Sequence, residues 1–232
     1  MYNIMNYFEI QLKQFLEEMI GECTIEYQYG TGIKFLKKVG ENTFVLIIHF
    51  SNDDYKYVSL TNILILPSML RKGVSVEIIN KLLSLCTEVE YDCYVTEIAS
   101  KRWKQGLLKH GGVEDNQGDV QIVKSEWVKH NTPKQLRFVE FEDELILDTE
   151  LEQFKEKKAR CIAEVSRIFE SWGTDVDIVQ PNGYVKALIA TTNDDTYYVL
   201  INYKIVDMLD NLIKENKLEE YLKEEKQIGL CL

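Results

Sequence analysis

The sequence predicts an α/β (α+β) fold, in which a mixed sheet with flanking helices is followed by a smaller C-terminal α+β unit. Several segments repeat apolar residues at three- and four-residue steps, which is typical of the buried face of a helix. Other segments alternate apolar and polar residues between turns of Gly, Asn and Asp, which is typical of strands. These helices and strands succeed one another along the chain, so we expect sheets with helical cover.

The composition indicates a folded protein and argues against nucleic-acid and membrane roles. The 232 residues are 45% hydrophobic, which is ordinary for a globular chain. A net charge of −11 argues against direct nucleic-acid binding, because that function normally uses a basic excess. No apolar stretch approaches the roughly 20 residues that span a bilayer, and no signal-peptide pattern is visible at the N-terminus.

Cysteine and histidine usage indicates reduced thiols and no metal site. The five cysteines are odd in number and show no CxxC spacing, so we expect free thiols in a cytoplasmic protein. The three histidines share no helical spacing, and a histidine-based metal site is therefore not expected.

A polar stretch divides the chain into two expected domains, residues 1–128 and 129–232. The stretch Lys129–Lys134 carries one of only three prolines, and such segments are typical of linkers. Residues 1–124 contain 13 basic and 16 acidic residues, whereas the remainder contains 14 and 22. Most of the negative charge therefore belongs to the second domain.

In the first domain the pattern predicts a helix, a meander of strands, and then alternating helices and strands. Tyr7–Ile20 has helical spacing and stops at Gly21. Turns rich in Gly, Asn and Asp separate the following strands, and Pro67 ends the fourth of them. The expected strands are Cys23–Tyr29, Ile33–Val39, Phe44–Phe50, Tyr55–Leu66, Asp92–Glu97 and Val120–Lys124. The expected later helices are Val74–Thr87 and Ser100–Lys109, the second ended by His110-Gly111-Gly112.

The second domain is expected to place two strands before a long helix, a hairpin and a final helix. The strands are Leu136–Phe141, Leu145–Asp148, Val176–Val179, Tyr184–Ala190 and Tyr197–Asn202, and the helices are Glu150–Trp172 and Ile205–Glu225. Seven carboxylates fall within residues 140–152. They form either a solvated strand edge that discourages aggregation or an acidic surface that binds a basic partner.

The two domains share one local similarity. Ile48–Val58 parallels Ile189–Val199 without gaps, and each copy contains an Asn-Asp-Asp turn between strands. Two explanations stay open: a partial duplication of a helix–hairpin–helix element, or the general preference of hairpin turns for Asn and Asp.

The segment between the fourth strand and the next helix has the features of an anion site. The strand ends abruptly, and the free N–H groups and dipole of a helix N-terminus favour a negative charge. Gly73 allows close approach to the backbone, and Arg71 and Lys72 add positive charge.

With these segments in place, residues 1–124 resemble the GNAT acyltransferase superfamily. That family has a strand, a pyrophosphate-binding loop, a helix, a splayed strand and a further helix with a Lys-x-Gly-aromatic ending. The corresponding segments here are Leu70–Ser75 and Leu108–Val113. The resemblance implies acetyl-CoA as the cofactor and transfer of its acyl group to an amine. It also implies that Ile65 and Leu66 lie beside the pantetheine. By the same resemblance, the phosphates would be held by Arg71, Lys72, Gly73, Val74 and Ser75.

The chain departs from the family pattern at positions that carry chemistry. The tyrosine that often serves as general acid falls on Leu107 or Leu108, and a leucine cannot protonate a thiolate. The candidate replacements are Glu97, as a general base or an exposed strand-end carboxylate, and His110, as a proton donor or a helix C-cap. Two functions therefore stay open: a GNAT-like acyltransferase, or a catalytically inactive GNAT-like interaction or inhibitor protein that binds a macromolecule through its acidic domain.

Overall fold

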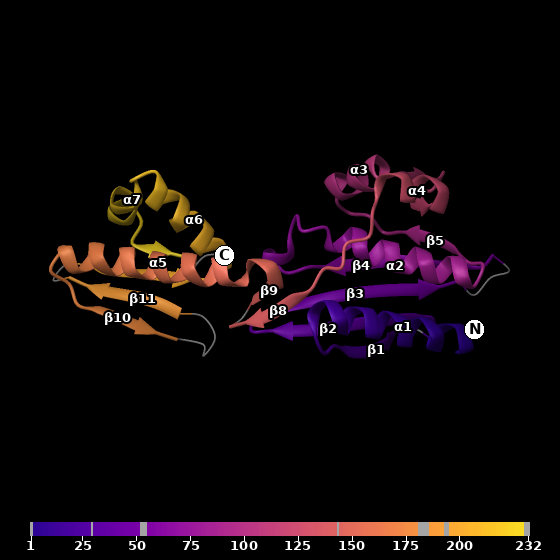
Figure 1. Cartoon of the computed structure of the whole chain (residues 1–232), viewed down its shortest axis with the longest axis horizontal. Helices are drawn as coiled ribbons and strands as arrows, with labels where there is room; N and C mark the ends of the chain where they lie inside the picture. Colours follow the sequence, from indigo (N-terminus) through magenta and orange to yellow (C-terminus); the bar gives the residue numbers. More distant parts are fainter. Residues whose placement is uncertain are drawn as a thin grey trace. The chain divides into compact units, whose positions relative to one another are not determined.

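Figure 1 shows the computed structural model of the chain, which describes residues 2–28, 30–51, 55–142, 144–180, 186–192 and 195–229. Within these residues the protein has seven α-helices and three sheets, which confirms the predicted α+β class. The chain divides into two compact units, Met1–Phe138 and Val139–Leu232. No helix of the described part is long and apolar enough to cross a bilayer.

The first unit contains a seven-stranded mixed sheet. Its strands are β1 (Thr24–Gln28), β2 (Gly32–Val39), β3 (Asn42–Phe50), β4 (Tyr57–Leu64), β5 (Asp92–Val95), β6 (Gly112–Glu114) and β7 (Val120–Ile122). Its helices are α1 (Tyr2–Ile20), α2 (Val74–Glu88), α3 (Lys101–Lys109) and α4 (Lys124–His130). The sheet order is β1-β2-β3-β4-β5-β7-β6, and β4 and β5 form its parallel pair among antiparallel neighbours.

Two elements of this unit were not predicted from the sequence. Strand β6 has only three residues, which is too short to show a period. Helix α4 begins at Lys124, where the sequence analysis expected the end of a strand. Its buried face depends mainly on Trp127, which is 1% exposed and gives no repeating pattern.

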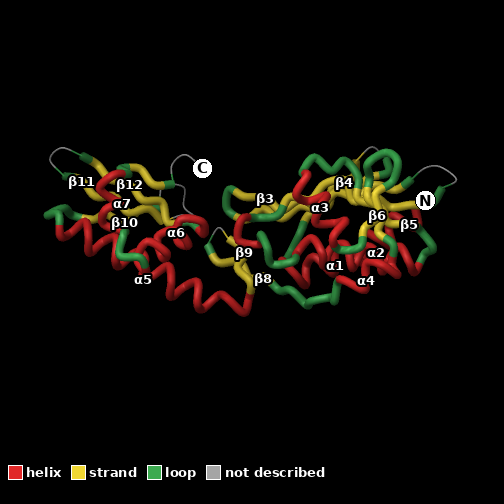
Figure 2. Tube along the Cα trace, turned by 90° about the horizontal axis from the view of Figure 1, so that it is seen from above, coloured by secondary structure: helices red, strands yellow, loops and turns green. Residues whose placement is uncertain are grey.

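One face of the sheet forms the core with α1 and α2. Alternate residues of β3 are buried, with Phe44, Leu46, Ile48 and Phe50 at most 4% exposed. The Phe8 ring of α1 meets Phe50 edge-to-face at 5.3 Å between centroids. Figure 2 shows α1 and α2 on the same side of the strands. The intervening residues of β3 are only half-buried, so the opposite face of the sheet is partly open.

A buried polar network attaches α4 and the following segment to the first unit. The Trp127 indole N–H donates to Asn80 Oδ1 at 2.7 Å. The Asn131 amide is 5% exposed and donates to the backbone oxygens of Trp127 (2.8 Å) and His110 (3.0 Å). The units consequently divide ten residues after the boundary expected at residue 128, because part of the predicted linker is packed rather than solvated.

The second unit has a four-stranded sheet and a two-stranded one. Its strands are β8 (Phe138–Phe141), β9 (Glu144–Leu147), β10 (Val176–Val179), β11 (Lys186–Thr191), β12 (Thr196–Ile201) and β13 (Gln227–Ile228). Its helices are α5 (Leu151–Ser171), α6 (Tyr203–Lys214) and α7 (Leu218–Glu224). The predicted single last helix is broken in two, because Asn216 adopts a left-handed φ of 55°.

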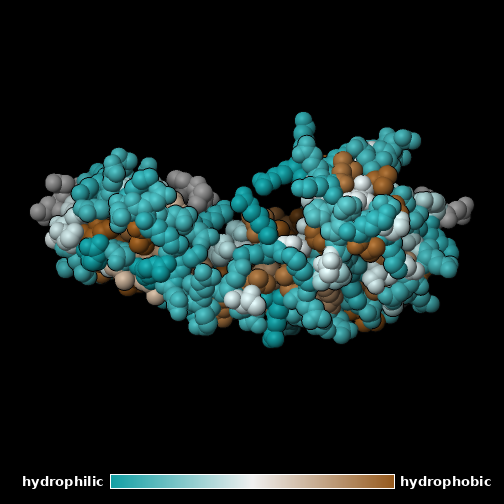
Figure 3. Space-filling model, turned by 45° about the horizontal axis from the view of Figure 1, so that its top comes forward, coloured by the Kyte–Doolittle hydropathy of each residue, from teal (hydrophilic) through white to brown (hydrophobic). Residues whose placement is uncertain are grey.

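The core of this unit lies between α5, α6 and the four-stranded sheet β10-β11-β12-β13. Val165 and Phe169 of α5, Leu188 of β11, and Val206 and Leu209 of α6 are completely buried. On the face shown in Figure 3 the surface of each unit is mostly hydrophilic, with hydrophobic side chains in small separate patches.

The two units share an order of elements but not a hairpin register. In each unit a helix precedes an antiparallel meander, and a strand parallel to the last meander strand follows the next helix or helices. Ile48 pairs with Leu60, whereas the aligned Ile189 pairs with Tyr198, which corresponds to Tyr57. The turn positions 52–54, 193 and 194, and most of the predicted turn at 180–183, lie outside the described residues. The duplication stays a prediction.

A buried carboxylate joins α5 to α6. Asp210 is 1% exposed, accepts a hydrogen bond from Lys214 Nζ at 2.6 Å and pairs with the Arg160 guanidinium. Burial would raise the pKa of Asp210, but the hydrogen bonds from Lys214 and Arg160 outweigh it and hold the pKa below its ordinary value.

We expect Asp210→Asn to lower the free energy of unfolding at pH 7 by about 1–3 kcal/mol, because buried charge-assisted hydrogen bonds are lost. The loss should shrink as the pH falls below about 4, because a carboxylate with a lowered folded-state pKa stabilises only while ionised. Urea unfolding at several pH values measures both effects. The matched control is Asp207→Asn, whose pair with Lys157 is more exposed than that of Asp210 and should contribute less, about 1 kcal/mol. Equal losses in the two variants would contradict the prediction.

Gly111 should not tolerate a side chain. It has a φ of 92°, and a Cβ there would lie 2.8 Å from the Glu126 carbonyl oxygen of α4. We expect Gly111→Ala to destabilise the protein by about 1–3 kcal/mol in urea unfolding. Gly106→Ala inside α3 meets no atom within 4 Å and should instead stabilise slightly. A neutral Gly111→Ala variant would show that the turn relaxes.

Candidate functional site

The parallel strands β4 and β5 part at their carboxyl ends. Their pairing runs from Tyr57 opposite Asp92 to Leu60 opposite Val95, and the Thr96 amide adds a 3.0 Å bond to the Leu60 oxygen. Strand β4 then continues to Leu64, whereas the chain after β5 turns away at Glu97, which has a left-handed φ of 55°. Beyond Leu60, β4 is still paired with β3 on one side, but its pairing with β5 on the other side has ended.

A β-bulge in β4 coincides with this parting. Ile48 lies opposite Leu60 and Ile47 opposite Asn62, so Thr61 is the extra residue. The Thr61 hydroxyl donates to the Ile47 oxygen at 3.4 Å. Bulges redirect the following residues, and here Leu64 is left 55% exposed on the strand.

The segment from β4 to α2 is buried in its first part and accessible where α2 begins. Leu66, Ser68 and Met69 are buried, and Pro67–Met69 forms one 3-10 turn. The Ser68 hydroxyl is buried without a hydrogen-bond partner in the described structure. Gly73 has a φ of 92° and caps α2 without a side chain. A Cβ at Gly73 would meet no atom within 4 Å, so the space beside the helix N-terminus is free.

The predicted CoA-contacting residues lie together along this segment, but their side chains differ in accessibility. Arg71 is exposed, and Lys72, Gly73, Ser75 and Ile65 are partly exposed. Leu66 and Val74 are at most 2% exposed as whole residues and pack in the core, so their side chains are not available to a ligand. Since the first amides of a helix have no intrahelical acceptor, the contacts available at α2 are mainly backbone N–H groups.

Glu97 and His110 are not brought together. Glu97 is exposed and precedes α3, whereas His110 follows α3, whose nine residues span about 13 Å. His110 caps α3, and its Nδ1 lies 2.6 Å from Asn131 Oδ1. Both hydrogens of the Asn131 amide already bind carbonyls, so His110 Nδ1 is the donor in this contact. The structural interpretation of His110, as a helix cap, therefore fits its contacts.

Asp119 is a candidate that the sequence analysis missed. It precedes β7, whose Val120 pairs with Val95, and so it lies at the same end of β5 as Glu97. Burial and the nearby Asp115 charge raise the pKa of Asp119, while the Glu97 amide and Lys104 partly offset them. The sequence Asp115–Asp119 reads only as a turn, and its closeness to the end of β5 depends on the insertion of β7 into the sheet.

Other reactive or charged side chains of this region, and Leu107, are held within the fold. Cys93 is 2% exposed, and its hydrogen bond with Cys86, together with burial, raises the pKa of the Cys86 thiol. Leu107, at the position of the family tyrosine, is 3% exposed. Lys104 donates to Glu114 Oε1 and to the Gly118 oxygen, both at 2.7 Å. No three His, Cys, Asp or Glu side chains in the described part of the chain could hold a metal ion.

Comparison with protein families, curated proteins and solved structures finds no match for this chain. Its function therefore has to be inferred from the geometry of its own residues.

We expect Asp119→Asn to stabilise the protein at pH 7 by up to about 1 kcal/mol. A carboxyl with a raised folded-state pKa costs stability when ionised, and this cost disappears as the pH falls through that pKa. The gain should therefore vanish in urea unfolding at about pH 4. Asn keeps an oxygen for the Glu97 amide, so a destabilised variant at pH 7 would contradict the assigned environment.

Proposed function

We propose that the first unit binds a CoA thioester and transfers its acyl group to an amine, as in GNAT-like acyltransferases. The observation that carries the proposal is the parting of parallel strands β4 and β5 next to a helix N-terminus whose cap, Gly73, has no side chain. The succession of β4, the loop, α2, β5 and α3 also agrees with the order of segments in the resemblance noted in the sequence.

The donor would lie along the β4–α2 segment. The pyrophosphate is directed to the amides that begin α2, where Gly73 leaves room and Arg71 and Lys72 supply positive charge. The pantetheine lies beside the β4 edge beyond Leu60, where pairing with β5 has ended. A backbone amide of β4 then polarises the thioester carbonyl.

Acyl transfer requires an acceptor for the amine proton. The amine nitrogen attacks the thioester carbon, the carbon–sulfur bond breaks, and the thiolate leaves. Asp119 suits the base role better than Glu97, because burial raises its pKa toward the working range while Glu97 is exposed. With leucines at positions 107 and 108, the leaving thiolate takes its proton from water.

The alternative, an inactive interaction protein that uses the acidic second unit, has weaker support. Carboxylates of the 140–152 segment are partly neutralised internally. Glu142 pairs with the buried Lys158, and Glu152 binds Lys155 at 2.8 Å. These pairs reduce the negative field available to a basic partner.

Acetyl-CoA at millimolar concentration should raise the melting temperature of the full chain, because a ligand that binds only the folded state stabilises it. We expect Gly73→Asp to abolish the shift by placing a carboxylate where the phosphates bind. Differential scanning fluorimetry measures both effects. Acetate and pyrophosphate at the same concentrations serve as the controls.

Gly73→Asn is the matched control. Asn and Asp have the same size and both tolerate a left-handed φ, so only the charge differs. Asn should keep more of the shift than Asp. An unchanged melting temperature of the wild type would overturn the proposed function, whereas equal shifts in the two variants would place the phosphates elsewhere.

A further inference from the structure

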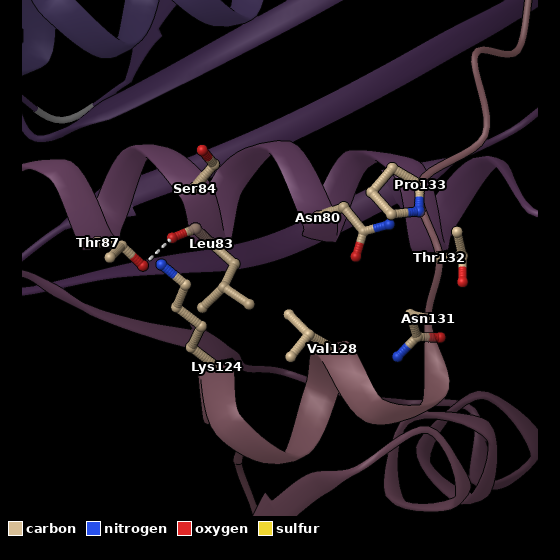
Figure 4. A pocket seen from close by; sticks show the side chains of 9 residues that line it. All are labelled: Asn80, Leu83, Ser84, Thr87, Lys124, Val128, Asn131, Thr132 and Pro133. Atoms are coloured by element: carbon tan, nitrogen blue, oxygen red, sulfur yellow. Dashed lines mark hydrogen bonds between the residues drawn. The ribbon is translucent and has the colours of Figure 1, made fainter.

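A groove lies between α2 and α4, away from the residues that begin α2 (Figure 4). Its volume is about 390 Å³, within the range of small-molecule sites. Leu83 of α2, Val128 of α4 and Pro133 provide apolar surface. Val128 is 54% exposed, so this wall is uncovered in the protein alone.

Most polar groups around the groove are used within the fold. The Thr87 hydroxyl donates to the Leu83 oxygen at 2.7 Å, and the Ser84 hydroxyl donates to Glu88 at 3.2 Å. Asn131 donates both amide hydrogens to backbone oxygens, as described above. Lys124 is the charged residue of the lining, and Figure 4 shows its side chain extending along one end of the groove toward Thr87.

Glu88, the last residue of α2, is a carboxylate on which the Lys124 charge acts. Hydrogen bonds from Tyr7 and Ser84 and the charges of Lys81 and Lys124 hold its pKa below the ordinary value, against the effect of burial. The Glu88 carboxylate therefore accepts hydrogen bonds from Tyr7 and Ser84, and the positive charge of Lys81 also stabilises it. Lys124 also acts on Glu88, but Glu88 keeps two hydrogen-bond donors and the charge of Lys81 when Lys124 turns to a ligand.

We propose that this groove binds a small amphipathic anion, namely a carboxylate with a short hydrocarbon chain. The ligand's carboxylate pairs with Lys124, and its hydrocarbon chain packs on Val128, Leu83 and Pro133. The anion forms a charge-assisted hydrogen bond with Lys124, and its hydrocarbon chain removes exposed apolar surface of the groove from water. The site is separate from the proposed acyl-donor site, because Asn80 at its near end lies about 9 Å along α2 from Val74.

The test uses octanoate as the probe and isothermal titration calorimetry of the full chain. We expect saturable binding at one site in the millimolar range or tighter. The Trp127 indole is bound to Asn80 of the lining, so tryptophan fluorescence should change with the same midpoint. Octanol and octylammonium, which have the same chain without the negative charge, should bind at least about tenfold more weakly.

Lys124→Met removes the charge and keeps the length of the side chain, and it should weaken octanoate about tenfold. Lys81→Met is the matched control, since Lys81 lies near the same Glu88 but does not line the groove. Its affinity should stay within about twofold of wild type. Val128→Asp should also abolish binding, and an unchanged melting temperature would show that the exposed position tolerates it. Absence of saturable binding, equal binding of octanol, or equal losses in Lys124→Met and Lys81→Met would overturn the proposal.

Discussion

The parallel pairing of β4 with β5 is the constraint on which the first unit depends. Two consecutive parallel strands cannot be joined by a tight turn, so the chain must cross over the sheet, and α2 makes this crossing. Helix α2 can cross only by burying an apolar face, which includes Ile78, Ile79 and Leu82. The crossing fixes where β4 must end and where α2 must begin. The open segment between them is thus a consequence of the topology.

A second constraint acts on the outer side of α2. Glu77 is 6% exposed; burial raises its pKa, and a Lys134 amide and the Asn80 side chain partly offset this effect. Asn80 in turn binds Trp127, and Asn131 ties the end of α4 to the end of α3. Buried polar groups need such partners, so the chain of hydrogen bonds holds α4 at a defined distance from α2. The groove between the two helices follows from that spacing.

The sequence predicted the elements that carry a clear period and missed those that depend on single residues. Helices α2 and α5 and the strands of the meander were expected within about two residues, because their apolar faces repeat, whereas α1 begins at Tyr2, five residues before the expected start. Helix α4 and the boundary between units depend on Trp127 and Asn131, whose burial comes from partners far along the chain. Asp119 was missed for the same reason: its neighbours Val95 and Glu97 are set by strand order, which local spacing does not encode. Leu66 and Val74 were expected to contact CoA, and the sequence did not show that both residues are buried in the core.

The two units differ at the helix N-terminus that follows the meander, and only the first leaves amides there without a side-chain cap. In the second unit β12 ends at Ile201, and the next residue, Asn202, caps α6 by accepting the Ile205 amide at 3.0 Å. The end of β4 is followed instead by nine residues, and the cap of α2 is Gly73, which has no side chain. A side-chain cap satisfies the amides that a phosphate would otherwise bind, whereas a glycine cap leaves them to solvent or a ligand. Similar successions of strands and helices therefore differ in chemistry through one cap residue and the length of the segment before it.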